Sequence, residues 1–399
     1  MRMMNRIEAI PLRSMQLGMR WDWETFPEYL DSLDRQGLGV NVGALVPFSP
    51  LRGYVLGMKA ARERTSVTEA ELNEMKRLLH QAMIAGAFGF SADKNLEDRT
   101  EDGSALPSHV ASPEEFLALA DVLSEFSVGH LGWTIGISTT ALEQQRLLTE
   151  MMRRSGRPLH VAVGDDEQGF AWAKEARDAG LPVVVQQNSM DPVAEFTLAE
   201  YNMFDYMPHW IQPLVGTPED EKQGKHPLDA FLDLALDDGM KTTFSHMLAN
   251  RGEETLARRI TNPYSHISLS DGGAHIRYLT ISTWPVHVLS YWVRDRQLMS
   301  LEQAHYKMSS LPAWLANFKS RGTLRVGDWA DIIVYNLDEL GYVYDKPTYA
   351  TDFPGGEWRR MQKPTGMRYI LVNGAITFES NTCTGALPGK LLRSYDMID

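Results

Sequence analysis

Short β-rich runs alternate with helical patterns along most of the first 320 residues of the chain. In the helical pattern at 65–85, apolar residues recur at three- and four-residue spacing, and Thr68 precedes Glu71 by the three residues of a capping box. Repeated strand–helix units of this length favour a parallel sheet or a (β/α) barrel, and the sequence alone leaves both open. The β-rich runs cover residues 39–46, 86–91, 129–137, 157–163, 181–187, 241–247 and 265–270.

The last part of the chain has a different pattern. Residues 321–337 and 367–380 are β-rich without a helix between them, and Asn373-Gly374 predicts a two-residue hairpin turn. The stretch at 352–366 is rich in Gly, Pro and Arg and is predicted to be a loop. We therefore expect two domains: a (β/α)-barrel portion at 1–320 and a C-terminal β segment at 321–399.

Charge and composition narrow the possible partners and compartments. A net charge of −13 argues against a nucleic-acid partner, because binding phosphates requires a basic face. No run of eighteen apolar residues predicts a membrane span, and residues 1–15 lack the apolar core of a signal peptide. The single cysteine, Cys383, excludes an intrachain disulfide and a cysteine-rich zinc site. A cytoplasmic protein is the expectation.

Several predicted strands end on polar residues. In a (β/α) barrel the reactive residues lie at the carboxyl ends of the strands, so these positions are candidates for an active site. Polar residues also begin ordinary loops, and for any single position that reading stays open. The strand-end residues are Ser91, Ser138, Asp165, Gln187, His246 and Asp271.

Three segments in the second half of the chain resemble the ending of the amidohydrolase superfamily: SDGGAH at 270–275, RGTLRVGDWADIIVYNLDEL at 321–340, and VNGAIT at 372–377. The closer resemblance is to the N-acyl-D-amino-acid deacylase group (D-aminoacylase-like, amidohydrolase family 3). The further segments that carry it are 21–47, 51–57, 86–93, 99–108 and 385–399. The resemblance implies a metal-dependent (β/α) barrel whose final strands join a small β-sandwich. It also implies hydrolysis of carbon–nitrogen bonds in small N-acyl amino acids or related amides.

The resemblance also implies roles for individual residues. A divalent metal, with zinc as the expectation, would activate a water molecule, and a strand-end carboxylate would carry the proton to the leaving nitrogen. Asp271 matches that carboxylate and is a candidate metal ligand as well. His275 and Ser91 are candidates for binding substrate or orienting the aspartate. His246 is the other candidate metal ligand, with a structural, hydrogen-bonded histidine as the alternative.

The superfamily's His-X-His pair does not occur, because no two of the 11 histidines are separated by one residue. The resemblance begins after that part of the barrel, so the first strands are expected to be missing and the metal ligands would have to be supplied from elsewhere. Phe48 and Asp98 also stand where relatives commonly have histidine. Two hypotheses follow: a metal-dependent deacylase, or an inactive amidohydrolase-like remnant or subunit that binds no metal alone. Either one could assemble with a partner chain or with copies of itself.

Some other charged and polar residues are also candidates for a site. Four arginines could hold a substrate carboxylate through bidentate contacts, although a surface position is the ordinary role of each. His130 lies at a strand start and is predicted to be structural. The four arginines are Arg52, Arg99, Arg359 and Arg360.

Overall fold

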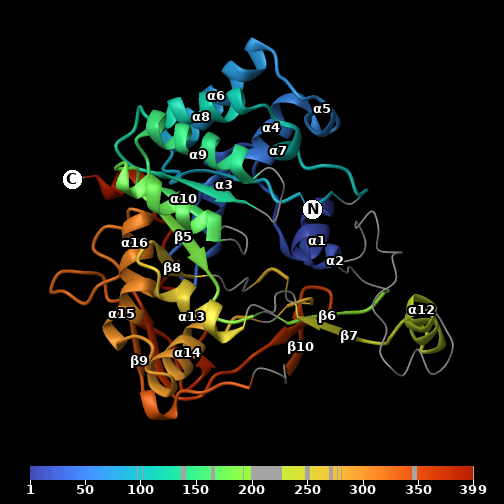
Figure 1. The fold of residues 1–399 in the computed structure, drawn as a ribbon, viewed down its shortest axis with the longest axis vertical. Coiled ribbons are helices and arrows are strands. Elements are labelled where there is room, and N and C mark those ends of the chain that lie inside the picture. The colour runs from blue at the N-terminus through green and yellow to red at the C-terminus, as the bar shows by residue number, and fades with distance from the viewer. Residues whose placement is uncertain are drawn as a thin grey trace.

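A parallel six-stranded sheet forms the centre of the molecule (Figure 1). The computed structural model describes residues 1–96, 98–100, 102–135, 141–162, 167–191, 193–198, 227–247, 252–268, 273–275, 277–279, 281–343 and 348–398. The strand order is β1-β2-β3-β4-β5-β8, so each strand pairs with the next one along the chain until β5. The strands are β1 (Val46–Pro47), β2 (Gly89–Asp93), β3 (His130–Thr134), β4 (Leu159–Ala162), β5 (Val183–Gln187) and β8 (Ser265–Ile267).

Helices connect these parallel strands, as parallel pairing requires. The connecting helices are α6 (Glu69–Ile84), α8 (Pro113–Leu123), α9 (Ala141–Ser155), α10 (Glu167–Asp178) and α13 (Glu253–Thr261). The Thr68 amide donates to the Glu71 carboxylate at 2.7 Å and the Glu71 amide donates to the Thr68 hydroxyl at 3.3 Å, which confirms the predicted capping box. The sequential strand order and these crossovers confirm the predicted α/β class.

Other helices cover the ends and sides of the sheet. α1 and α2 lie near the edge where the parallel strands end, and α4, α5 and α7 lie with α6 and α8 on one side (Figure 1). Their bounds are α1 (Arg2–Glu8), α2 (Leu12–Gly18), α3 (Phe26–Gln36), α4 (Phe48–Leu56), α5 (Met58–Glu63), α7 (Pro107–Val110), α12 (Pro227–Asp237), α14 (Trp284–His287), α15 (Leu301–His305) and α16 (Leu311–Leu315). Two π-helical stretches, Val288–Asp295 and Tyr306–Ser310, follow α14 and α15.

The two faces of the sheet differ in chemistry. Alternate residues of a strand point to opposite faces. On the helix side, Phe90, Leu131, Trp133, Leu159 and Val183 are buried in the main hydrophobic core. The other face carries polar side chains, which are Ser91, Asp93, His130, His160, Gln186 and His266. This second face is therefore the place to look for a site.

The β-rich run at 241–247 does not join the parallel sheet. Its strand β7 (Phe244–Met247) pairs antiparallel with β6 (Val193–Phe196). Placing this run among the parallel strands is therefore wrong. Phe196, Phe231 and Phe244 pack together, so the strand buries its apolar face against its antiparallel partner and α12. The run at 39–46 is also mostly not a strand, because only Val46 of it lies in β1.

The C-terminal segment is antiparallel. β9 (Ile332–Tyr335), β12 (Met367–Val372), β13 (Ala375–Glu379) and β14 (Thr382–Cys383) form a four-stranded sheet in the order β14-β13-β12-β9. Asn373 and Gly374 join β12 to β13 with φ of 49° and 85°, which confirms the predicted hairpin turn. The division into 1–320 and 321–399 stays a prediction, and residues 390 and 391 run back to pair with residues near Val42.

The predicted loop at 352–366 is wrong. β10 (Thr348–Phe353) and β11 (Glu357–Met361) form an antiparallel hairpin there. Gly355 and Gly356 turn the chain between the two strands with φ of 85° and 73°, a conformation that glycine adopts without strain. The glycines and proline mark only the turn, because the arginines and aromatic residues around them lie in the strands.

None of the helices in the described part of the chain is long and apolar enough to cross a membrane.

Candidate functional site

The predicted catalytic aspartate lies just beyond the described part of β8. That strand ends at Ile267, and Asp271 is outside the described residues, which resume at Gly273. His246 lies in β7 opposite Ala194, and its side chain is also outside the description. Ser138 and Asp165 are outside the described residues as well. The roles predicted for Asp271 and His246 stay predictions.

His275 is held by the first helix of the chain. Its amide donates to the carbonyl of Glu8 at 2.5 Å, and its Nε2 lies 3.4 Å from the Glu8 carboxylate. His275 has a φ of 53° and Gly273 a φ of 107°, so the chain turns sharply here. Glu8 is the last residue of α1, and this helix therefore closes over the segment that follows β8.

A partly buried carboxyl group lies close to the same helix. Asp93 ends β2 on the polar face of the sheet, and its carboxylate accepts a hydrogen bond from the Asn95 amide at 2.7 Å. Burial, and then the nearby charge of Asp98, raises the pKa of Asp93 to about 8. The charge of Glu8 acts in the same direction. Asp93 consequently holds a proton at neutral pH, beside the helix that contacts His275.

The sequence analysis missed Asp93. Its position two residues after Ser91 was the available signal, because residues i and i+2 of a strand share a face. Ser91 itself lies one step deeper along the strand, next to Gly132 of β3. The structure therefore places both side chains on the polar face, with Asp93 nearer its carboxyl edge.

Three histidines lie deeper on this face. The rings of His160 and His266 meet edge to face with their centroids 4.8 Å apart. Burial lowers the pKa of His160 to about 4 and those of His130 and His266 to about 3. Ring nitrogens on all three have no hydrogen-bond partner. These imidazoles are neutral at neutral pH, and His130 has the buried strand-start position predicted for a structural residue.

Three of the four candidate arginines are engaged elsewhere. Arg52 is fully buried, and its guanidinium binds the Glu115 carboxylate in a bidentate contact at 2.7 and 3.2 Å. Arg359 pairs with Asp352 at 2.8 Å on the exposed side of the β10–β11 hairpin. Arg360 is buried against backbone carbonyls. Arg52 and Arg360 are therefore buried rather than on the surface, and a substrate-binding role for each of the four arginines stays a prediction.

The described residues do not make a metal site by themselves. No group of three or more His, Cys, Asp or Glu residues in this part of the chain is arranged to hold an ion. His160 and His266 offer unpartnered imidazole nitrogens, which suit zinc or copper, but they are only two ligands.

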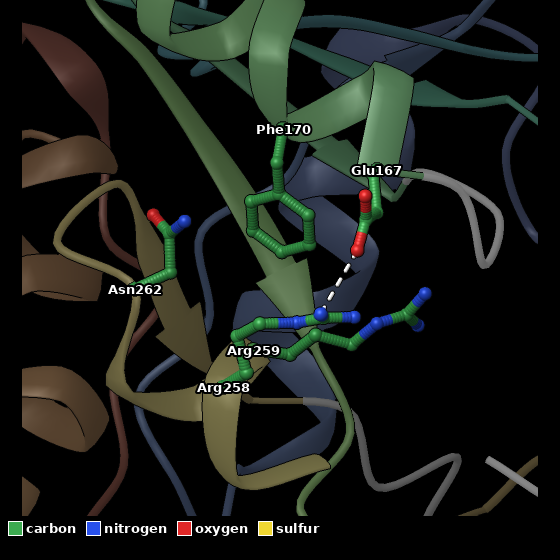
Figure 2. A pocket seen from close by; sticks show the side chains of 5 residues that line it. All are labelled: Glu167, Phe170, Arg258, Arg259 and Asn262. Carbon is green, nitrogen blue, oxygen red and sulfur yellow. Dashed lines mark ion pairs between the residues drawn. The ribbon is translucent and has the colours of Figure 1, made fainter. Parts of the chain in front are cut away.

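A groove on the outside of the molecule is a different feature (Figure 2). It lies between α10 and α13, on the helix side of the sheet. The exposed ion pair between Glu167 and Arg258, 2.9 Å apart, crosses it beside Phe170. Its position behind the strands separates it from the polar face. Its lining residues are Glu167, Phe170, Arg258, Arg259 and Asn262.

Comparisons with known proteins agree with this architecture. Residues 254–378 match the model of the amidohydrolase family. An uncharacterized protein of Mycobacterium tuberculosis is 27% identical over 471 residues, covering 96% of this chain and 75% of the relative. The N-acyl-D-glutamate deacylase of Alcaligenes xylosoxydans xylosoxydans is 26% identical, covering 92% of this chain and 72% of that enzyme.

Solved structures show the same fold. A D-aminoacylase variant in complex with copper chloride has a TM-score of 0.67 at 21% identity, covering 96% of this chain and 78% of that one. The N-acyl-D-glutamate deacylase of Bordetella bronchiseptica, complexed with zinc and a phosphonate inhibitor, has a TM-score of 0.66 at 24% identity, with the same coverage. The molecule thus has an amidohydrolase fold. The resemblance predicted from the sequence is confirmed, since the relatives and solved structures that match this chain include D-aminoacylase-like amidohydrolases.

Proposed function

We propose that this protein hydrolyses carbon–nitrogen bonds in non-peptide amides, as an N-acyl-D-amino-acid deacylase. One observation carries the proposal: His275, which follows the acid and the two glycines in the sequence, is held by Glu8 of α1. The deacylases among the relatives and solved structures support it. The substrate would be a small N-acyl amino acid or a related amide.

The residues would divide the work as follows. Asp271 would accept the proton of the attacking water and deliver it to the leaving nitrogen. His275, through its ion pair with Glu8, would hold the segment that carries Asp271, and Ser91 would contact substrate on the polar face. Asp93 keeps its proton at neutral pH and would present a neutral hydrogen-bond donor rather than a second negative charge near a substrate carboxylate.

A divalent metal belongs to this proposal, with zinc as in the deacylase complex. When bound, it would lower the pKa of the attacking water and polarise the amide carbonyl. Asp271 and His246 are the ligands we propose. The described residues hold no group of three ligands, so they do not fit the ion by themselves.

Hydrolysis of N-acyl-D-amino acids by the zinc-supplemented full chain tests this function, with release of the free amino acid as the measurement and the L-enantiomers as substrate controls. The variant Asp271→Asn is expected to lower kcat by about 10²–10⁴-fold, the usual contribution of a general acid–base. Asp178→Asn, on the exposed side of α10, is the matched control and should leave kcat unchanged. A wild-type chain that releases no amino acid with metal present would contradict the proposal.

A second candidate is an inactive amidohydrolase-like subunit that assembles with a partner chain or with itself. The observation that favours it is the lack of a three-ligand group in the described part of the chain. Metal analysis distinguishes the two, because less than about 0.1 equivalent of zinc fits a protein without a complete ligand set. Light scattering on the same sample would show whether the chain assembles.

A further inference from the structure

The β10–β11 hairpin contacts the residues that follow the predicted catalytic aspartate. In Figure 1, β10 lies beside β6 and β7, far from its own sequence neighbours in the four-stranded sheet. Residues 277–279 run between this hairpin and β6. Leu279 bridges Ala194, and the Glu195 amide donates to the carbonyl of Tyr278 at 2.9 Å.

Arg360 of β11 contacts both residues 277–279 and β6. Its side chain is only 4% exposed, and one terminal nitrogen donates to the carbonyl of Tyr278 at 3.1 Å. The other donates to the carbonyl of Glu195, also at 3.1 Å, and the Glu195 carboxylate lies 3.2 Å from the guanidinium. Charge-assisted hydrogen bonds from a rigid guanidinium fix geometry more strongly than neutral ones. Arg360 therefore sets the spacing between residues 277–279 and β6.

A second pair of contacts holds the same segment. The guanidinium of Arg277 forms an ion pair with Glu357, and its Nε donates to the carbonyl of Trp358 at 3.1 Å. The guanidinium also lies 4.8 Å from the centre of the Trp358 ring, within the range of a cation–π contact. From the other side, Glu8 holds His275. The described residues at 273–275 and 277–279 thus contact α1, β6 and the hairpin.

We propose that Arg360 is a positioning residue, which holds the segment after β8 and thereby Asp271 in its reactive place. The inference rests on the proposed deacylase function. Asp271 precedes His275 by four residues, so the contacts at 275, 277 and 278 lie four to seven residues after it in the sequence. Displacing a catalytic group by about 1 Å can lower a rate by about 10²-fold, even when the change lies outside the reacting atoms.

Arg360→Gln and Glu357→Gln in the full chain test the inference, with Arg359→Gln as the matched control. Arg359 is the next residue of the same strand, and its partner Asp352 lies within the hairpin. Hydrogen exchange of the Tyr278 and Leu279 amides, which bond to the carbonyl of His275, reports on the segment without needing activity. We expect exchange to accelerate by about tenfold or more in Arg360→Gln, because a buried charged hydrogen bond is lost.

Kinetics on the same proteins separate positioning from general stability. In Arg360→Gln, kcat should fall by about 10²-fold with KM nearly unchanged, and Arg360→Lys should recover part of it. Should Arg360→Gln fail to fold, Glu357→Gln, whose side chain is partly exposed, decides the matter through the same two readouts. Unchanged exchange and unchanged kcat in both variants, or equal effects in Arg359→Gln, would overturn the inference. An inactive wild type would overturn the proposed function instead, and the exchange rates would then decide whether the hairpin holds the segment.

Discussion

The two faces of the parallel sheet are formed by the same strands but differ in the chemistry of their side chains. On the helix side, Leu131 and Leu159 are fully buried among apolar side chains. On the opposite face, Asp93 and His160 are partly buried and His266 is buried, with strongly shifted pKa values and several unpartnered ring nitrogens. One face supplies stability, and the other places polar groups in a low-dielectric environment.

The difference shows which part of the sheet is available for chemistry. Unpaired buried polar groups cost free energy, so a fold that keeps them on one face has to be stabilised elsewhere. Shifted pKa values cluster at functional sites for the same reason. We therefore expect substitutions on the helix side to lower stability at every pH. Substitutions on the polar face should mainly change the pH dependence of stability.

The largest effect is expected on the helix side. Leu159→Ala removes a fully buried side chain from the core and should lower the free energy of unfolding by about 2–5 kcal/mol. The loss should be the same at pH 6 and pH 8, because the leucine side chain carries no titratable group. Urea denaturation at both pH values measures it. A loss in the free energy of unfolding that changes strongly with pH would contradict this difference between the two faces.

A smaller, pH-dependent effect is expected for His266→Leu. Burial lowers the pKa of His266 to about 3 from 6.5, so below pH 6.5 the unfolded chain binds a proton that the folded chain does not. Wild-type stability should therefore fall as the pH drops from 6.5 toward 3. The leucine variant should be more stable than wild type by about 2 kcal/mol at pH 5 and nearly equal to it at pH 7. Thermal melts across this range measure it, with the exposed His80→Gln as control.

Asp93→Asn should act in the opposite pH direction. The pKa of Asp93 is raised from 3.8 to about 8, so the folded chain holds a proton that the unfolded chain loses. The stabilisation is complete below pH 3.8 and is lost as the pH rises through 8. Asparagine cannot titrate, and the variant should melt a few degrees above wild type at pH 8 but not at pH 4. Melting temperatures that change with pH in the same way in both proteins would contradict the raised pKa of Asp93.

The smallest effect on stability is expected for Ser91→Ala. The side chain is short, and removing its hydroxyl should change the free energy of unfolding by no more than about 0.5 kcal/mol. If Ser91 contacts substrate as proposed, KM should rise while the melting temperature stays constant. A lower melting temperature with an unchanged KM would instead indicate a structural role for Ser91.

Much of the fold could be predicted because its signals are local. The capping box at Thr68 and the hairpin turn at Asn373-Gly374 each depend on a few adjacent residues, and both formed as expected. The strand at 241–247 was recognised but assigned to the wrong sheet, because β-propensity does not choose a pairing partner. The hairpin at 348–361 was missed, because its turn glycines and arginines have the composition of a loop.

The site was less predictable than the fold. The motif around Asp271 and His275 stood out as a sequence pattern, and the resemblance gave it a role. Asp93 has no such motif, and its raised pKa depends on burial and on Asp98, five residues away and outside the strand. The burial of Arg52 and Arg360 was unpredictable for a related reason, because it depends on which carboxylates and carbonyls the fold brings to each guanidinium.

By itself the sequence determined the alternation of strands and helices, the helix starts, the exclusion of a disulfide, and the resemblance to the amidohydrolases. These depend on periodicity and on short patterns, which act over a few residues. Only the tertiary structure decided which face of the sheet is polar, which arginines are engaged, and that a hairpin of the C-terminal segment grips the residues after Asp271. Those contacts join residues about 80 positions apart, such as Arg360 and Tyr278, and no local pattern encodes such a distance.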